Sequence, residues 1–402
     1  MEIIETRKTA VTEQCDVLVC GGGFAGISAA LAAARQGRRV TLLEREYLLG
    51  GLGTAGLVTI FLPLCDGMGQ QVSFGIAEEL LRLSVSMGHE GRMPAAWLAG
   101  DRAHCGSADP RFEASFNPQL FAMLAEQLLL REGVRILYGT LAAAVHCAED
   151  GVIDAVILEN KSGRSAIAVG SVVDATGDAD VARLAGAPTA LFAQGNVLAA
   201  WYYRYSQQSG YGLKMLGCCD IPEEQKDGKN GVKLLSSRRY AGVEGAEISE
   251  LVCASHAVTL SDIRAMRERL GDDYVPVTLP TIPQLRMTRK LVGVCTPDDR
   301  EPHAFRSDSI GMVSDWRRRG PVFEVPFGSL YAKECPNLLV AGRCVSATDS
   351  LWDLMRVIPC CCVTGQAAGT AAALGRDMSA LSVPLLQQTL VKSGVVLHWQ
   401  DL

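Results

Sequence analysis

The chain has 402 residues, of which 48% are hydrophobic and 20% are charged. A chain this apolar can bury a sizeable core, so its composition excludes an intrinsically disordered protein, and its length predicts two or three domains. The 38 basic and 44 acidic residues give a net charge of −6, which argues against a protein that binds the phosphate backbone of nucleic acids.

The 14 cysteines form no C-x-x-C pair, so the sequence has no zinc-ribbon or cysteine-run iron–sulfur motif and predicts no metal site. The first residues, MEIIETRK, lack the apolar stretch of a signal peptide, and we expect a cytoplasmic protein with reduced thiols. Two uncharged stretches, 17–34 and 357–375, are long enough to span a membrane. Because they are rich in alanine and glycine, we expect buried helices of a soluble protein instead.

Residues 16–44 follow the order strand, glycine turn, helix, strand and acid. Gly21 permits the tight turn, Gly23 lets a pyrophosphate approach the backbone, and Gly26 lets the helix pack closely on the strand. Glu44 ends the second strand, where a carboxylate can accept hydrogen bonds from an adenosine ribose and would repel the 2′-phosphate of NADP. The unit therefore predicts a dinucleotide site.

A second glycine-rich run, 50–56, follows at once. It is either a flexible loop or a second backbone cradle, in which Thr54 would donate its hydroxyl to a phosphate. Residues 57–116 are rich in predicted loops and contain one expected helix, 76–87.

Several regular elements are expected after residue 116. Asn117 as N-cap and Pro118 as first helical residue open a helix that ends at Gly133. Short strands are then expected at 134–138, 141–146, 153–159, 165–169 and 172–174, and the last strand runs into a glycine turn.

The second half of the chain is less regular. Residues 186–325 contain many prolines and turn residues, with one helix expected from Ser261 as N-cap to Gly271. A buried strand at 337–341 precedes Gly342 and Arg343, and a long helix is expected at 357–374.

These pieces together resemble the FAD-dependent oxidoreductase family, whose FAD domain is similar to that of fumarate reductase and L-aspartate oxidase flavoproteins. The matching residues are Gly21–Gly26 with Glu44, 50–56, 174–178, 286–290, and 337–348 followed by 356–373. The resemblance covers most of the chain, and its most specific parts are 342–348 and 365–370. The chain departs from the family at Met287, where an acid is usual, and at Asp349, where a histidine is frequent. Any catalytic role of those family residues is altered or lost here.

The resemblance implies an α/β fold, with a Rossmann-like FAD-binding domain of the glutathione-reductase type and an inserted α+β substrate or cap domain. The FAD-binding domain would comprise 1–185, in which 57–116 faces the substrate, and 326–385. The cap would comprise 186–325, and 386–402 would form a C-terminal tail.

The implied cofactor is FAD. The residues expected to bind it are Gly21, Gly23, Phe24, Ala25, Gly26, Glu44, Arg45, Gly50, Gly51, Thr54, Ala55, Ala175, Thr176, Gly177, Asp178, Gly342, Arg343, Val357 and Ile358. The last two begin the long helix, where backbone N–H groups would stabilise the negative charge of reduced flavin at N1 and C2=O.

Four residues are candidates for catalysis: Arg356, Arg289, Arg286 and Asp349. Arg356 is either a salt-bridged surface arginine or a cation beside the flavin or an anionic group of the substrate. Arg286 and Arg289 are three residues apart, so they could share one face of a helix and line the site. Asp349 lies near Trp352, which would either stack on a ring substrate or pack in a turn.

Other reactive side chains have simpler interpretations. The cysteines at 360–362 lie in the first turn of a helix, where the dipole lowers a thiol pKa, but cysteine also packs as a small hydrophobe. The same holds for the pair at 218–219. His104, His256 and His303 lie in regions that could face a substrate, although each is more simply a surface or packed imidazole.

The expected function is an FAD-dependent oxidoreductase that moves a hydride between flavin N5 and a small organic substrate. One alternative is a flavin-binding subunit that passes electrons to a partner protein. Another is an NAD-dependent dehydrogenase, which the third FAD-type element at 337–375 disfavours. We expect a small-molecule substrate and no nucleic-acid or membrane partner. An electron-transfer partner and a homo-oligomer are both compatible with the sequence.

Overall fold

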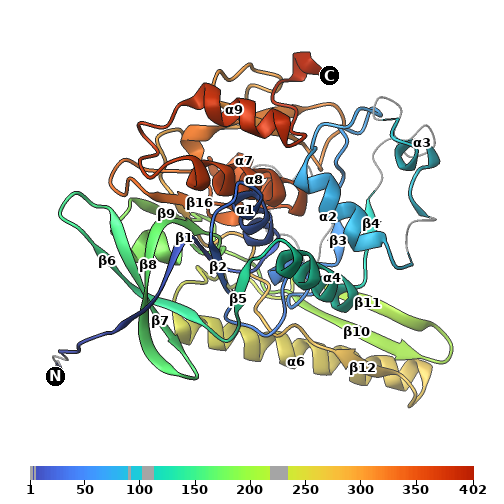
Figure 1. Cartoon of the computed structure of the whole chain (residues 1–402). Helices are drawn as coiled ribbons and strands as arrows, with labels where there is room; N and C mark the ends of the chain where they lie inside the picture. Colours follow the sequence, from blue (N-terminus) through green and yellow to red (C-terminus); the bar gives the residue numbers. More distant parts are fainter. Residues whose placement is uncertain (1–2, 4–5, 89–91, 102–112, 218–233) are drawn as a thin grey trace.

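The computed structural model describes residue 3 and residues 6–88, 92–101, 113–217 and 234–402. Within these residues, the largest sheet has seven strands, and α-helices cover it (Figure 1). His104 and the cysteine pair at 218–219, for which the sequence offered interpretations, lie outside the described residues.

One part of this sheet is parallel, in the order β5-β2-β1-β8-β16. These strands are β5 Arg135–Leu137, β2 Val40–Leu43, β1 Val11–Cys20, β8 Gly163–Asp174 and β16 Leu338–Val340. In the register of the sheet Cys20 pairs with Leu43 and Asp174, and Asp174 also pairs with Val340. The carboxyl ends of four strands therefore meet at one edge, where α/β proteins bind their ligands.

An antiparallel meander of β6 Leu141–Cys147 and β7 Ile153–Asn160 adds to the first half of β8. The sequence predicted two strands, 165–169 and 172–174, where the structure has the single strand β8. Gly170 does not interrupt it, because the lack of a side chain lets β1 come close. A Cβ at Gly170 would lie 2.5 Å from the carbonyl oxygen of Asp16.

Two small-residue helices, α1 Phe24–Arg35 and α8 Ile358–Leu374, pack against each other beside this sheet (Figure 1). A Cβ at Gly365 or Gly369 would lie 2.2 or 2.1 Å from a backbone oxygen of α1. In the described part of the chain no single helix is long and apolar enough to cross a membrane. The pair α7 Asp349–Met355 and α8 passes that test together but is bent by 88° at its break.

The remaining elements around this sheet are short. Asn117 caps α4 as predicted, because its side chain accepts hydrogen bonds from the backbone N–H groups of Gln119 and Leu120. The elements are β3 Ile60–Phe61, α2 Ile76–Val85, α3 Ala95–Leu98, β4 Ala114–Ser115, α4 Pro118–Arg131, α5 Asp180–Leu184, β9 Thr189–Leu191, β13 Arg289–Leu291, β14 Ser309–Ser314, β15 Val322–Pro326 and α9 Val383–Lys392.

A second, three-stranded sheet has the order β11-β10-β12, and the long helix α6 runs along it (Figure 1). Its elements are β10 Ala200–Ser206, β11 Gly210–Leu216, α6 Gly245–Leu270 and β12 Val275–Thr278. Tyr202 points to α6 and donates a hydrogen bond to Asp262 at 2.6 Å. The side chains that alternate with it, Trp201 and Tyr203, lie on the opposite face of the sheet.

The helix expected to begin at Ser261 instead begins at Gly245, so that prediction of its start was wrong. Only Leu251, Thr259 and Ile263 of α6 are buried. Such a sparse apolar face gives little helical periodicity in the sequence, which is why the first half of α6 was not predicted.

The expectation of reduced thiols throughout also needs a correction. Ten cysteines in the described residues are free, whereas Cys65 is disulfide-bonded.

Candidate functional site

A cavity of about 440 Å³ opens where the carboxyl ends of β1, β2, β8 and β16 meet. This volume lies within the usual range of ligand pockets. Fifteen of the predicted cofactor-binding residues line it: Gly21, Gly23, Phe24, Ala25, Glu44, Arg45, Gly50, Gly51, Ala175, Thr176, Gly177, Gly342, Arg343, Val357 and Ile358. Two of the four catalytic candidates, Arg286 and Arg356, line it as well.

The glycine turn after β1 has the geometry that its sequence predicts. Gly21 has a φ of +104°, and a Cβ there would lie 2.4 Å from the carbonyl oxygen of Ala175. Gly26 does not line the cavity but permits close packing, since a Cβ there would lie 1.8 Å from the carbonyl oxygen of Gly21.

Gly23 is different, because no protein atom requires a glycine at this position. Its φ of −69° suits any residue, and a Cβ built on it would have no heavy atom of the described chain within 4 Å. Gly23 lines the cavity and is the N-cap of α1, where no described side chain caps the first N–H groups. Open space beside free N–H groups at a helix start fits a phosphate.

Glu44 lies at the end of β2 with its carboxylate held by the backbone. It accepts hydrogen bonds from the N–H groups of Gly22 at 2.7 Å and Glu46 at 2.8 Å. Burial raises the pKa of this carboxyl above its usual value, although both hydrogen bonds oppose that shift. A fixed carboxylate on the cavity wall fits the predicted contact with a ribose.

The second glycine run holds its own turn together. The hydroxyl of Thr54 donates to the carbonyl oxygen of Leu49 at 2.5 Å, and neither Thr54 nor Ala55 lines the cavity. Thr54 is therefore committed to this turn, and the prediction that it donates to a phosphate was wrong. The backbone of Gly50 and Gly51 lines the cavity instead.

Arg356 lies just before α8, at the corner between α7 and α8. It donates a hydrogen bond from Nη2 to the carboxylate of Asp353, which is fully buried. Arg356, Val357 and Ile358 all line the cavity, so the start of α8 and its preceding cation face the same space. Arg356 is thus both ion-paired and part of the cavity wall.

The cysteines of α8 do not have the low pKa that a helix N-terminus favours. Cys360, Cys361 and Cys362 are buried, and burial raises the pKa of all three thiols, to about 12 for Cys361. Desolvation outweighs the helix dipole here, so these side chains pack as small hydrophobes.

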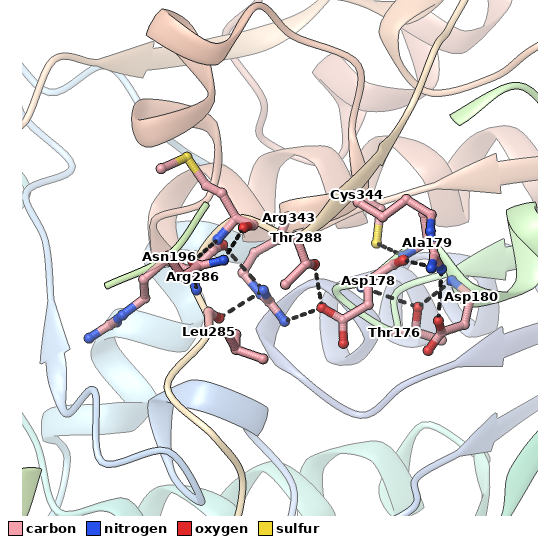
Figure 2. Close-up of polar contacts among 12 residues, drawn as sticks. Thr176, Asp178, Ala179, Asp180, Asn196, Leu285, Arg286, Thr288, Arg343 and Cys344 are labelled. Carbon is pink, nitrogen blue, oxygen red and sulfur yellow. Dashed lines mark hydrogen bonds and ion pairs between the residues drawn. The ribbon is translucent and has the colours of Figure 1, made fainter. Parts of the chain in front are cut away.

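A polar network joins the turn after β8 to Arg343 and to residues 285–288 (Figure 2). Arg343 donates from Nη1 to the carbonyl oxygens of Leu285 at 2.9 Å and Arg286 at 3.2 Å, and from Nη2 to Asp178 at 3.3 Å. Thr288 donates to the same Asp178 oxygen at 2.6 Å. Asp178 itself does not line the cavity; it holds these three segments together.

The remaining catalytic candidates are placed elsewhere. Arg289 begins β13 and donates to Asp180 at 3.2 Å, so Arg286 and Arg289 do not share a helical face and only Arg286 lines the cavity. Asp349 accepts a hydrogen bond from Lys290 at 2.6 Å and also lies outside the cavity wall.

Trp352 and the described histidines also lie away from the cavity. Trp352 is fully buried and donates from Nε1 to the carbonyl oxygen of Arg343 at 2.7 Å, so it is not free to stack on a substrate. His256 is exposed on α6, and His303 is exposed and packs against Trp399.

Sequence reasoning missed several apolar residues of the cavity wall: Trp201, Met215, Ile282 and Trp316. Trp201 and Met215 are paired directly across β10 and β11, so they lie on one face of the second sheet. The aromatic run Trp201–Tyr205 was the available signal, because aromatic residues are enriched in β-strands.

A model of the family described as FAD dependent oxidoreductase matches residues 16–202 and 298–390. The chain belongs to the FAD dependent oxidoreductase family. It is therefore an oxidoreductase with FAD as its cofactor, which replaces the NAD-dependent alternative. The segment between the two matched parts contains β11, α6 and β12 and lies outside the match.

Solved structures with a similar fold have low identity to this chain. A geranylgeranyl bacteriochlorophyll reductase-like protein from Thermoplasma acidophilum is 13% identical, with 95% of this chain and 82% of that chain covered and a TM-score of 0.47. A p-nitrophenol 4-monooxygenase from Pseudomonas putida DLL-E4 is 14% identical, with 94% and 84% covered and a TM-score of 0.47. A flavocytochrome c3 fumarate reductase is 14% identical, with 90% and 78% covered and a TM-score of 0.43.

Proposed function

We propose that this FAD-dependent oxidoreductase transfers a hydride between flavin N5 and a small organic substrate bound against the second sheet. One observation carries the proposal. A single cavity is lined by the predicted FAD-binding turns and also by Trp201 and Met215 of β10 and β11. Such a cavity can hold a cofactor and a second molecule in contact with each other.

Particular residues would hold FAD in this cavity. Glu44 would bind the ribose, and the turn at Gly23 with the start of α1 would bind the pyrophosphate. The backbone N–H group of Ile358 would face the flavin ring, whereas the N–H group of Val357, also predicted for this role, donates to the carbonyl oxygen of Leu354 at 3.5 Å. FAD supplies the hydride chemistry when bound.

The protein's own contribution is to place charge and exclude water. The N-terminal end of α8 would set a positive potential at one side of the cavity, which favours a flavin that has gained negative charge, and Arg356 lines the same side with its charge balanced by Asp353. Trp201, Met215 and Ile282 provide an apolar wall that keeps water from the reacting atoms.

The domain division expected from the sequence is part of the same proposal. Residues 1–185 and 326–385 would form the FAD-binding domain, and 186–325 would form the cap that carries the substrate wall. The second sheet and α6, which lie within 186–325, support this division.

Anaerobic titration of the purified protein tests the proposed reaction. The oxidised protein is mixed with a panel of small organic reductants, and the pre-reduced protein with small organic oxidants, while the visible absorbance of the flavin is followed. We expect at least one small molecule to change the redox state of the flavin stoichiometrically. A flavin that reacts only with an added electron-transfer protein would contradict the proposal and identify an electron-transfer subunit.

A further inference from the structure

The second sheet has apolar side chains on both faces, although α6 packs on only one of them (Figure 1). On the face that α6 covers, Tyr202 packs with Ile263. On the other face, β11 carries Tyr211, Leu213 and Met215, which we call the β11 stripe. An antiparallel sheet that is packed on one face usually has polar side chains on the other. An apolar second face therefore indicates a binding surface.

One residue of the β11 stripe belongs both to the cavity wall and to the outer surface of the protein. Met215 lines the cavity, and its side chain is also 48% exposed. Its partner across the strands, Trp201, lines the cavity as well but is buried. The apolar wall of the cavity therefore continues onto the surface at Met215, and the β11 stripe begins at the mouth of the cavity.

The β11 stripe leads away from the cavity mouth along the edge of the second sheet. β11 is an outer strand, because the order of the sheet is β11-β10-β12. Leu213 is half-buried, and Tyr211 at the far end is 56% exposed. Tyr211 lies four residues from Met215, which corresponds to about 13 Å along a strand. A ligand held entirely inside the cavity would leave this apolar surface in contact with water.

The far end of the β11 stripe is held in place by contacts that lead back to the cavity wall. The ring of Tyr211 stacks on the ring of Tyr203, with centroids 4.9 Å apart and 11° between the planes. The hydroxyls of Tyr203 and Thr59 are hydrogen-bonded at 2.7 Å. Thr59 lies between Val58 and Ile60, and both of these residues line the cavity. The stripe is thus a preformed surface, and a ligand that binds it loses little affinity to the ordering of side chains.

We propose, on the basis of the proposed function, that the substrate is an elongated apolar molecule that extends out of the cavity. Its reacting end lies in the cavity beside Trp201, and its hydrocarbon tail leaves the cavity over Met215. The tail then lies along the β11 stripe as far as Tyr211. Because burial of apolar surface stabilises a complex in proportion to the area buried, each further carbon on the stripe adds affinity. The continuity of the stripe with the cavity favours one ligand that occupies both over a partner protein that covers the stripe alone.

Straight-chain alcohols of increasing length test this substrate class. Butanol, hexanol, octanol and decanol are titrated into the FAD-loaded protein, and their affinities are measured by isothermal titration calorimetry without turnover. We expect the affinity to rise about fourfold with each two added carbons, because a chain lying on an open stripe buries about half of the surface of two methylene groups. The rise should continue through decanol, since the stripe extends the apolar surface beyond the mouth of the cavity.

Substitutions along the β11 stripe should end this rise in the order of their positions. Y211S should leave the affinities for butanol and hexanol unchanged and remove the gain from octanol to decanol. L213S, which is nearer to the cavity mouth, should remove the gain at a shorter chain. L130S is the matched control, because Leu130 is an exposed apolar residue of α4 that does not line the cavity. It should retain the full rise, and thermal unfolding of each variant establishes that the fold is intact.

An affinity that does not rise with chain length in the wild type, or a rise that is equal in Y211S, would overturn the inference. Sedimentation of both proteins tests the other occupant of the stripe. A wild-type dimer that Y211S converts to a monomer, without any dependence of affinity on chain length, would assign the stripe to a contact between two copies and also overturn the inference. Because calorimetry requires no reaction, this failure is distinct from failure of the proposed hydride transfer, which the anaerobic titration detects.

Discussion

At the scale of single residues, Arg356 and Asp353 form a buried ion pair just before α8. Asp353 is fully buried and accepts a hydrogen bond from Arg356, while Nη1 of Arg317 lies 4.0 Å from its second oxygen. Breaking one member of such a pair leaves a charge in a low-dielectric interior, which costs more than the pair itself contributes. Arg356 therefore has a structural role in addition to its place in the cavity wall.

We expect R356M to destabilise the protein by about 3 kcal/mol, because it removes the hydrogen-bonded cation from a buried carboxylate. The double variant R356M/D353N removes both charges and should recover more than half of this loss. Urea unfolding of the three proteins gives the free energies. If the double variant is no more stable than R356M, the loss comes from packing and not from an uncompensated charge.

Single residues also show where sequence reasoning was sufficient. Gly21 and Glu44 were predicted to lie in one site from the local order of strand, turn, helix and strand, and both line the cavity. The prediction for Thr54 failed, because its hydroxyl could donate either to a phosphate or to the nearby carbonyl oxygen of Leu49, and it donates to Leu49. A local hydrogen bond of this kind competes with a ligand for the hydroxyl, and the spacing of residues in the sequence does not predict it.

At the scale of elements, the end of β8 depends on one buried carboxylate. Asp174 is fully buried and accepts hydrogen bonds from Thr176 and from the N–H of Ala182. These hydrogen bonds hold the turn that lines the cavity. Burial raises the pKa of Asp174 from 3.8 to about 6. The folded protein therefore holds this proton at a pH where the unfolded chain has already released it.

The contribution of Asp174 to stability is full below about pH 4 and is lost as the pH rises towards 6, because the unfolded chain releases the proton first. Between pH 4.5 and 7.5 this loss should be about 2 kcal/mol. We expect D174N to lower overall stability, because it removes one acceptor, and to reduce the fall in stability over this pH range by that amount. D150N, on an exposed loop, is the control. A pH dependence that is equal in wild type and D174N would contradict the effect of burial on this carboxyl.

Elements with a strong local pattern were predicted, and those defined by distant contacts were not. The small-residue helices α1 and α8 and the capped helix α4 were predicted close to their actual bounds. Residues 285–288 have no hydrophobic periodicity that predicts a helix or strand. Their conformation is fixed by hydrogen bonds to Asn196 and Arg343, which are distant in sequence. For that reason Arg286 and Arg289 were placed on one helical face that does not exist.

At the scale of the whole molecule, the cavity is assembled from segments that are far apart in sequence. The turns after β1 and β8, the strands β10 and β11, and the corner before α8 each supply part of its wall. The nucleotide side was predictable because one βαβ unit provides most of it. The apolar wall was not, because it depends on how the second sheet lies over the first, and no local pattern contains that information.

Gly23 allows the most direct test of the claim that this cavity holds FAD. Its backbone suits alanine, and the added methyl group would meet no heavy atom of the described chain within 4 Å. G23A should therefore fold with a stability within about 1 kcal/mol of the wild type, because the entropic gain of replacing glycine by alanine is opposed by the poorer N-cap preference of alanine. The methyl group would occupy the space proposed for the pyrophosphate.

The measurement is the FAD affinity of the apoprotein, with thermal unfolding of the same sample to establish that the fold is intact. We expect G23A to unfold within a few degrees of the wild-type apoprotein and to bind FAD at least about tenfold more weakly, because the methyl group overpacks the phosphate site. A folded G23A protein that binds FAD as tightly as the wild type would contradict the placement of the cofactor in this cavity.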